Sequence, residues 1–184
     1  MAHLVGISGS LRKGSFNTSL LKAAQELMPS GSTLEIASIE GIPLYNFDVE
    51  TEGIPKAVDL LKDRIAAAEG LLLVTPEYNN SIPGVFKNAI DWLSRPPKDI
   101  PRVFNGRPVA LIGASTSLGG TRFSQVAWLP VLRTLGTQPY FGKLLYSASA
   151  AQAFDPEGRL IDEKVRSQLT LVMAGFVKFI TTGR

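Results

Sequence analysis

The chain has 184 residues, of which 45% are hydrophobic and 19% are charged, so it is long enough and apolar enough for one folded domain over residues 1–184. It contains no cysteine and one histidine, His3, which excludes disulfides, thiolate metal sites, cysteine nucleophiles and sites that need several histidines. The net charge is +3, but Lys and Arg form no cluster longer than Arg12-Lys13, so we expect small anionic ligands rather than nucleic acid as partners.

Predicted strands and helices alternate along the chain. The first apolar run, 3–8, is predicted to be a strand, and because no basic leader precedes it we expect no secretory signal and a cytoplasmic location. No apolar run approaches the ~20 residues that a membrane-spanning helix needs, so we expect no membrane association. The elements that follow are helix 16–28, strand 33–39, loop 41–53, helix 55–68, strand 71–74, irregular segment 75–84, helix 85–93, extended surface loop 94–101, strand 108–114, loop 115–120, helix 122–135 interrupted or kinked at Pro130, strand 138–145 and helix 162–180.

This alternation predicts parallel strands joined by helical crossovers. The preferred fold is a flavodoxin-like three-layer α/β sandwich with a five-stranded parallel sheet in the order 2-1-3-4-5. In that order, ligands bind at the carboxyl ends of the first, third and fourth strands, where the strand order reverses. We therefore expect a site made by loops 9–18, 75–83 and 115–120.

The first of these loops has the composition of a phosphate site. Residues 9–18 read GSLRKGSFNT, which supplies hydroxyls, an amide and free backbone N–H groups at the start of a helix. Arg12 adds a planar fork of donors suited to phosphate oxygens, and no acidic residue precedes Glu26 to repel an anion. The alternative is that Ser10, Ser15 and Asn17 only cap the helix, although one capping residue would suffice for that.

Two other phosphate-binding motifs do not match this loop. Gly9 and Gly14 have the spacing of a P-loop, but Ser15 stands where that motif needs lysine. The G-x-G-x-x-G fingerprint of dinucleotide-binding folds is also absent, since only Gly6 and Gly9 precede the turn. The sequence therefore disfavours an ATPase, a kinase or a dinucleotide fold of that kind.

The second loop carries the most specific signal. Residues 76–84 read PEYNNSIPG and lead into VFKNAIDW over 85–92. Together with Gly9-Ser10-Leu11-Arg12 and Ser15-x-Asn17, this pattern resembles the NADPH-dependent FMN reductase family, which includes bacterial chromate and quinone reductases. The resemblance extends from about residue 3 to residue 175.

The resemblance implies the residues that bind FMN. In that family the first loop binds the phosphate, the PEYN turn lies along the edge of the isoalloxazine ring, and the loop after the fourth strand completes the pocket. A rigid turn of Pro, Tyr and Asn suits a flavin independently, because it offers backbone donors and an aromatic wall. The implied FMN-binding residues are Ser10, Arg12, Ser15, Asn17 and Thr18 in the first loop, Pro76, Glu77, Tyr78 and Asn79 in the turn, and Ser115 in the third loop, with Ser117, Gly119 and Gly120 as further candidates.

The resemblance also implies an activity. It describes an enzyme that passes electrons from NADPH or NADH through FMN to a quinone-like acceptor by a ping-pong mechanism, with no catalytic side chain. Chromate, azo compounds and free flavin are alternative acceptors. A homodimer or homotetramer is implied as well, with the 123–135 stretch including Trp128 and the 94–101 loop as contact surfaces.

Two other functions stay open at this point. One is a non-enzymatic flavodoxin-type electron carrier, although such carriers are typically acidic and this chain is basic. The other is a receiver-type signalling domain with the same strand order. That domain needs an acidic cluster where Gly9-Ser10 stand and a phosphorylatable aspartate where Thr75-Pro76 stand.

Several further residues lie close to the predicted loops. We expect Tyr78 to line the flavin and Trp92 to pack in the core. Asn88 is predicted to hold the second loop, and Asp91 to pair with a basic residue at a subunit contact. Arg122 is interpreted as a cofactor, substrate or interface contact, or as a solvated residue at a helix start.

Overall fold

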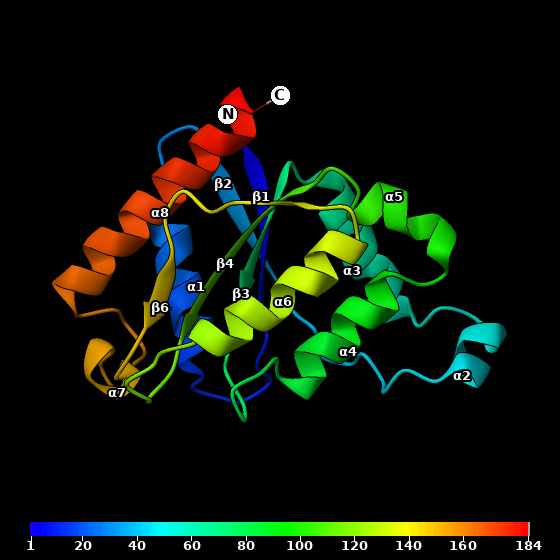
Figure 1. Ribbon diagram of the computed structural model, residues 1–184, viewed down its shortest axis with the longest axis horizontal. Helices are drawn as coiled ribbons and strands as arrows, with labels where there is room; N and C mark the ends of the chain where they lie inside the picture. Colours follow the sequence, from blue (N-terminus) through cyan, green and yellow to red (C-terminus); the bar gives the residue numbers. More distant parts are fainter. Residues whose placement is uncertain (184) are drawn as a thin grey trace.

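Short, largely apolar segments pair in parallel to form the sheet at the centre of the molecule. The structure, a computed structural model, describes residues 1–183 (Figure 1). The strands are β1 (His3–Ser8), β2 (Thr33–Ala37), β3 (Gly70–Val74), β4 (Pro108–Ala114), β5 (Gln138–Pro139) and β6 (Leu145–Ser147). They lie in the order β2-β1-β3-β4-β5, and β6 also pairs with β4. The predicted flavodoxin-like order is confirmed, with a sixth strand added.

Helices cover both faces of this sheet (Figure 1). They are α1 (Phe16–Glu26), α2 (Phe47–Glu52), α3 (Lys56–Ala67), α4 (Gly84–Leu93), the 3₁₀ helix η1 (Pro97–Asp99), α5 (Ile100–Val103), α6 (Arg122–Thr134), α7 (Ala150–Ala153) and α8 (Glu163–Thr182). One buried cluster joins α1 and α8 to one face of the sheet, and a second joins α3, α4, α5 and α6 to the other. Within residues 1–183, no helix is long and apolar enough to cross a bilayer.

The register of the strands sets where the loops begin. Ser8 of β1 pairs with Val74 of β3, and Val74 pairs with Ile112 of β4, so the three strands end at one edge of the sheet. The ladder continues one step further, because the Gly9 amide donates to the Val74 carbonyl (2.9 Å) and the Thr75 amide donates to the Ile112 carbonyl (2.8 Å). The loops that follow these strands therefore start side by side.

Segment 41–53 was predicted to be a loop. This prediction is partly wrong, because the segment contains α2. The Asn46 side chain caps this helix by accepting a hydrogen bond from the Asp48 amide (2.9 Å). Glu50 accepts hydrogen bonds from Arg95 Nε (2.8 Å) and from the Tyr45 hydroxyl (2.7 Å), and the Arg95 bond holds the pKa of Glu50 below its ordinary value. None of the residues of α2 is buried, so the sequence shows no apolar periodicity there.

Segment 94–101 was predicted to be an extended surface loop. This prediction is wrong, because η1 and the start of α5 occupy most of the segment. Pro97 is the first residue of η1 and Pro101 the second residue of α5, and in the first turn of a helix a missing N–H group costs no hydrogen bond. Lys62 of α3 is fully buried beneath segment 94–101 and holds it by two hydrogen bonds. Its Nζ donates to Asp99 Oδ2 (2.9 Å) and to the Arg95 carbonyl.

The predicted strand 138–145 divides into β5 and β6, separated by an irregular segment. A Cβ on Gly142 would lie 2.6 Å from the ring of Tyr140, so the chain folds back closely upon that ring. Tyr140 in turn contacts Phe176 of α8, with ring centroids 5.6 Å apart. The helix over 122–135 was predicted to be interrupted or kinked at Pro130; an interruption is wrong, since α6 continues through Pro130 to Thr134, and the kink stays a prediction.

Candidate functional site

The loops that follow β1, β3 and β4 converge on one cavity of about 290 Å³. They lie together along the lower edge of the sheet in Figure 1. Of the ten residues predicted to bind FMN, all line this cavity except Thr18 and Asn79, whereas the further candidates Ser117, Gly119 and Gly120 do not line it. The lining residues are Ser10, Arg12, Ser15, Phe16, Asn17, Pro76, Glu77, Tyr78, Ala114, Ser115 and Thr116.

Loop 9–15 presents unused backbone donors beside an arginine. Gly14 has a φ of +68°, a conformation that favours glycine, and this bend brings the chain round to the start of α1. The backbone N–H groups of Ser10, Leu11 and Gly14 have no hydrogen-bond partner within residues 1–183. Arg12 is held over the loop, because its Nη2 donates to the Gly14 carbonyl (3.0 Å) and its guanidinium lies 5.5 Å from the ring of Phe16.

Ser15 begins α1 as its capping residue. Its hydroxyl accepts a hydrogen bond from the Asn17 amide (3.3 Å), which satisfies one of the donors that a helix leaves free at its start. The cap prediction and the phosphate prediction are compatible here, because the free donors of loop 9–15 precede the cap. This combination of free N–H groups, hydroxyls and a guanidinium is the chemistry that binds phosphate.

The turn after β3 is tight and leaves its aromatic residue open to solvent. Tyr78 and Ser81 exchange two backbone hydrogen bonds of 3.1 and 2.9 Å. Asn79 and Asn80 between them have φ values of +50° and +58°, which asparagine tolerates better than most residues. Asn79 thus shapes the turn, and Tyr78, with 52% of its surface exposed, forms an aromatic wall of the cavity.

Three further side chains of the predicted set, those of Asn17, Glu77 and Thr18, make hydrogen bonds to residues outside their own loops. The Asn17 carboxamide bonds to both backbone groups of Ala114, and Glu77 accepts from the Ser124 amide. The Thr18 hydroxyl donates to Ser8 Oγ (3.0 Å). The sequence could not reveal these partners, because up to 97 positions separate the paired residues.

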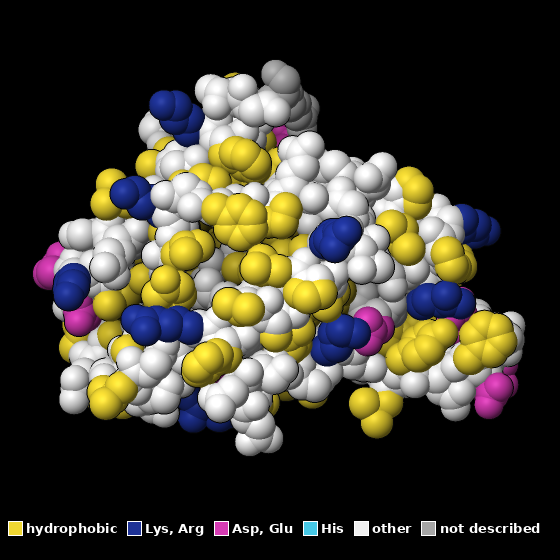
Figure 2. Space-filling view, in the orientation of Figure 1, with side chains coloured by type: hydrophobic (Ala, Val, Ile, Leu, Met, Phe, Trp, Pro, Cys, Tyr) yellow, Lys and Arg dark blue, Asp and Glu magenta, His cyan; other side chains and the backbone are white. Residues whose placement is uncertain are grey.

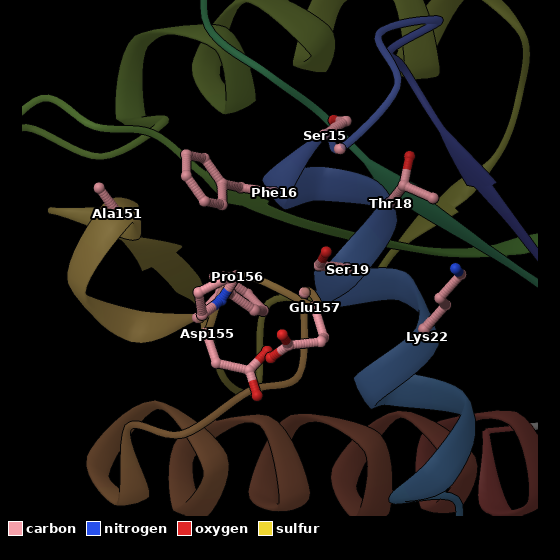
Figure 3. A pocket seen from close by; sticks show the side chains of 12 residues that line it. Ser15, Phe16, Thr18, Ser19, Lys22, Ala151, Asp155, Pro156 and Glu157 are labelled. Atoms are coloured by element: carbon pink, nitrogen blue, oxygen red, sulfur yellow. The ribbon is translucent and has the colours of Figure 1, made fainter.

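A larger groove of about 590 Å³ adjoins the cavity and shares Ser15 and Phe16 with it. Figure 3 shows α1 on one side of this groove, with Ser19 and Lys22, and the segment that carries Asp155 on the other. The rings of Phe16 and Phe154 stack at its end nearest the cavity, with centroids 5.8 Å apart. No residue of this second wall was predicted, since residues 151–158 carry no motif.

A glycine in β4 permits the close approach of loops two and three. A Cβ on Gly113 would lie 2.2 Å from the backbone oxygen of Thr75 and 2.4 Å from Thr121 Oγ1. Because that backbone cannot move aside cheaply, we expect Gly113→Ala to lower the free energy of unfolding by about 1–3 kcal/mol in urea denaturation. Gly119→Ala is the matched control, since nothing lies within 4 Å of its Cβ and its stability should match that of the wild type.

The remaining predicted residues have structural partners. Trp92 is fully buried and donates to the Pro43 carbonyl (2.9 Å), and Asn88 bonds to residues 43 and 45, so it holds that segment rather than loop 75–83. Asp91 pairs with Lys87 of its own helix (2.7 Å). Arg122 lies over the ring of Tyr146 at 5.1 Å. Trp128 is fully buried and therefore forms no contact surface.

Comparison with known proteins decides the family. A model described as NADPH-dependent FMN reductase matches residues 2–152. The chain belongs to the NADPH-dependent FMN reductase family. This FMN reductase family member is 47% identical over 163 residues to the NAD(P)H-dependent FMN reductase PA1204 of Pseudomonas aeruginosa, which covers 89% of this chain and 86% of that relative. It is 37% identical over 180 residues to a quinone reductase of Escherichia coli K12, covering 96% and 94% of the two chains.

A solved structure agrees with these sequence matches. The flavoenzyme FerB of Paracoccus denitrificans, an NAD(P)H:(acceptor) oxidoreductase, superposes with a TM-score of 0.87 at 34% identity over 98% of each chain. The family predicted from the two loops and the flavodoxin-like fold predicted from the alternation of strands and helices are both confirmed. As a member of this family, the protein is an oxidoreductase that depends on FMN and on a reduced nicotinamide.

Proposed function

We propose that this FMN reductase family member passes electrons from NADPH or NADH to a quinone-like acceptor, and that its FMN lies in the cavity between loops 9–15, 76–81 and 115–116. The observation that carries the proposal is the convergence of free phosphate donors and an exposed aromatic turn on one cavity. Relatives named as a quinone reductase and a 2-hydroxy-1,4-benzoquinone reductase support this class of acceptor.

The residues present fit FMN at both of its ends. The unpaired N–H groups of Ser10, Leu11 and Gly14, with Arg12 and the Ser15 hydroxyl, would hold the phosphate. Pro76, Tyr78 and Ser115 would hold the ring system, Tyr78 as a wall and the backbone as hydrogen-bond donors and acceptors. When bound there, FMN supplies the hydride acceptor and the electron donor of the reaction. The protein supplies position and charge.

The open side of the cavity supports a ping-pong mechanism. Tyr78 and Thr116 are both exposed at the rim, so the nicotinamide and the acceptor would reach the same open face in turn. The single histidine, His3, bonds to Thr33 in β2, away from the cavity, so protons would come from solvent. Binding to one face in turn predicts parallel lines in double-reciprocal plots at several acceptor concentrations.

Steady-state kinetics test the proposed activity. The protein loaded with FMN is assayed with NADH and with NADPH against a panel of quinones, and then with chromate, an azo dye and free FMN as acceptors. We expect sustained nicotinamide oxidation, fastest with quinones. A protein that is reduced once and does not turn over would be a flavodoxin-type carrier. A protein that turns over fastest with another acceptor would contradict the quinone assignment.

We also infer that the enzyme self-associates through an apolar face beside α6. An apolar groove of about 350 Å³ lies between this helix and segment 139–146. Phe123 and Val126 of α6 are 58% and 63% exposed, and Phe141 across the groove is 62% exposed. Figure 2 shows hydrophobic side chains gathered over this face. Exposed apolar patches of this kind mark interfaces, and a second copy of the chain is the partner that the implied homo-oligomer requires.

Substitution of Leu144, which lines that groove, tests the interface. Leu144→Glu would bury a charge in the interface, so we expect sedimentation velocity to show a shift from oligomer to monomer at micromolar concentration. Leu171→Glu on α8 is the matched control, because Leu171 is similarly exposed (56% against 49%) but lies outside the groove. An unchanged oligomer in the Leu144 variant, or a monomeric wild type, would place the association elsewhere or remove it.

A further inference from the structure

We propose that Asn17 and Glu77 are positioning residues that fix the three loops relative to one another before any flavin binds. Their hydrogen bonds to Ala114 and Ser124 are called ties below. The expected effect of the ties on flavin affinity rests on the proposed function, whereas the ties themselves form without flavin. One tie runs to Ala114, which directly precedes loop 115–120, and the other to Ser124 in the first turn of α6, the helix that follows this loop. The third loop is thereby held at both of its ends.

The first tie joins the start of α1 to the end of β4. Asn17, only 4% exposed, accepts a hydrogen bond from the Ala114 amide at Oδ1 and donates to the Ala114 carbonyl from Nδ2, both at 2.9 Å. Alternate residues of a strand direct their backbone groups to the same side, so Ala114 faces the side on which Ile112 bonds to Thr75. Beyond Thr75 the chain after β3 no longer pairs with β4, and the Asn17 carboxamide takes the place of a neighbouring strand for the backbone groups of Ala114.

A carboxamide is suited to this place. It offers a donor and an acceptor side by side, as a backbone does, which a hydroxyl or a carboxylate cannot. Without it, both backbone groups of Ala114 would be buried beside the cavity with no partner, which is unfavourable. Asn17 thus sets the distance between loop 9–15 and Ser115.

The second tie joins loop 76–81 to the first turn of α6. Glu77 Oε2 accepts a hydrogen bond from the Ser124 amide (3.0 Å). Thr121 precedes this thirteen-residue helix but makes no capping bond with its side chain, so Glu77 supplies the cap from another loop. A carboxylate at a helix start is also favoured by the helix dipole.

A buried hydrogen-bond network around the Thr75 and Ser124 hydroxyls also joins the turn after β3 to α6. Thr75 and Ser124, both fully buried, share a hydrogen bond between their hydroxyls (2.8 Å). Trp128 Nε1 donates to Thr75 Oγ1 (3.1 Å), and the Thr75 hydroxyl donates to the Pro76 carbonyl (2.9 Å). Ser124 and Trp128 of α6 therefore orient the Pro76 carbonyl through the Thr75 hydroxyl, and Glu77 binds the same helix at the Ser124 amide.

Hydrogen exchange of the full chain without flavin tests the ties directly. We expect Asn17→Ala to speed exchange of the Ala114 amide at least tenfold, and Glu77→Ala to do the same for the Ser124 amide. Amides of β1 and β3 should change little, since they report global opening. Glu77→Gln keeps an acceptor at the same place and should restore the protection of Ser124. Should Asn17→Ala fail to fold, Asn17→Ser, which is too short to reach both groups of Ala114, carries the same test.

Flavin titration of the same variants tests the consequence. Asn17→Ala and Glu77→Ala should each weaken FMN binding about tenfold or more, and Glu77→Gln should bind nearly as the wild type does. Unchanged exchange at Ala114 and Ser124 would overturn the proposal, because a direct ligand role alone moves no amide in the flavin-free protein. An equal loss of affinity in Glu77→Gln and Glu77→Ala would overturn it as well. If the wild type binds no FMN, the proposed function fails while the exchange result still decides the ties.

Discussion

Arg12→Ala is expected to weaken FMN binding by roughly 10- to 100-fold, measured by fluorescence titration of the flavin-free protein. Hydrogen bonds to charged groups contribute about 1.5–3 kcal/mol each, and each 1.4 kcal/mol corresponds to a factor of about ten in affinity. The guanidinium already lies over the cavity, because it bonds to Gly14 and contacts the Phe16 ring. The structure therefore provides Arg12 in position, and its loss removes the main cation of the proposed phosphate site.

Two controls make this result specific to the phosphate. Riboflavin lacks the phosphate, so its affinity should be the same for Arg12→Ala and the wild type. Lys13→Ala removes the neighbouring exposed cation, which does not line the cavity, and should change FMN affinity little. Equal losses for FMN and riboflavin, or an equal effect of Lys13→Ala, would contradict the assignment of Arg12.

Asp99→Asn is expected to lower the free energy of unfolding by about 3 kcal/mol at pH 7, because it leaves the buried charge of Lys62 with only the longer contact to the half-exposed carboxylate of Asp59 (3.6 Å). Lys62 is fully buried, and Asp99 is 19% exposed at 2.9 Å from it. Asp63→Asn is the matched control. Its partner Arg102 is 42% exposed and Asp63 itself is 68% exposed, so its loss should cost less than about 1 kcal/mol. Urea denaturation of both variants gives the comparison.

The Asp99 contribution also has a defined pH dependence. The hydrogen bond from Lys62 holds the pKa of Asp99 below its ordinary value, so the folded state favours the carboxylate. Its stabilisation is complete above the unfolded pKa, near 3.9, and is lost as the pH falls through the lower folded pKa. The stability difference between wild type and Asp99→Asn should therefore shrink only below about pH 4. A difference that is constant from pH 7 to pH 3 would contradict the ion pair.

The sequence predicted the sheet order and the three loops of the site because those features leave local patterns. Fully apolar runs such as 71–74 indicate strands covered on both faces, and parallel strands end at a common edge. The polar loops that follow such strands are then close in space. Ser15 was predicted to bind phosphate, with helix capping as the alternative; the structure shows it capping α1 and also lining the cavity, and Arg12 lines the cavity as well.

The partners of the site residues could not be predicted, because nothing local records them. Asn17 bonds to Ala114, 97 positions away, and Glu77 bonds to Ser124, 47 positions away. Helix α2 escaped prediction for a related reason. None of its six residues is fully buried, although Val49 packs against the core, and the Glu50 ion pair with Arg95 is one of the contacts that hold the helix in place. Features fixed by tertiary contacts alone become visible only in three dimensions.

The most direct test of the central claim is a crystal structure of the protein with FMN bound. We predict that the phosphate accepts hydrogen bonds from the backbone of loop 9–15 and from Arg12, and that the ring system lies against Pro76, Tyr78 and Ser115. FMN bound elsewhere, such as in the groove between Lys22 and Asp155, or crystals that take up no FMN at saturating concentration, would contradict this site.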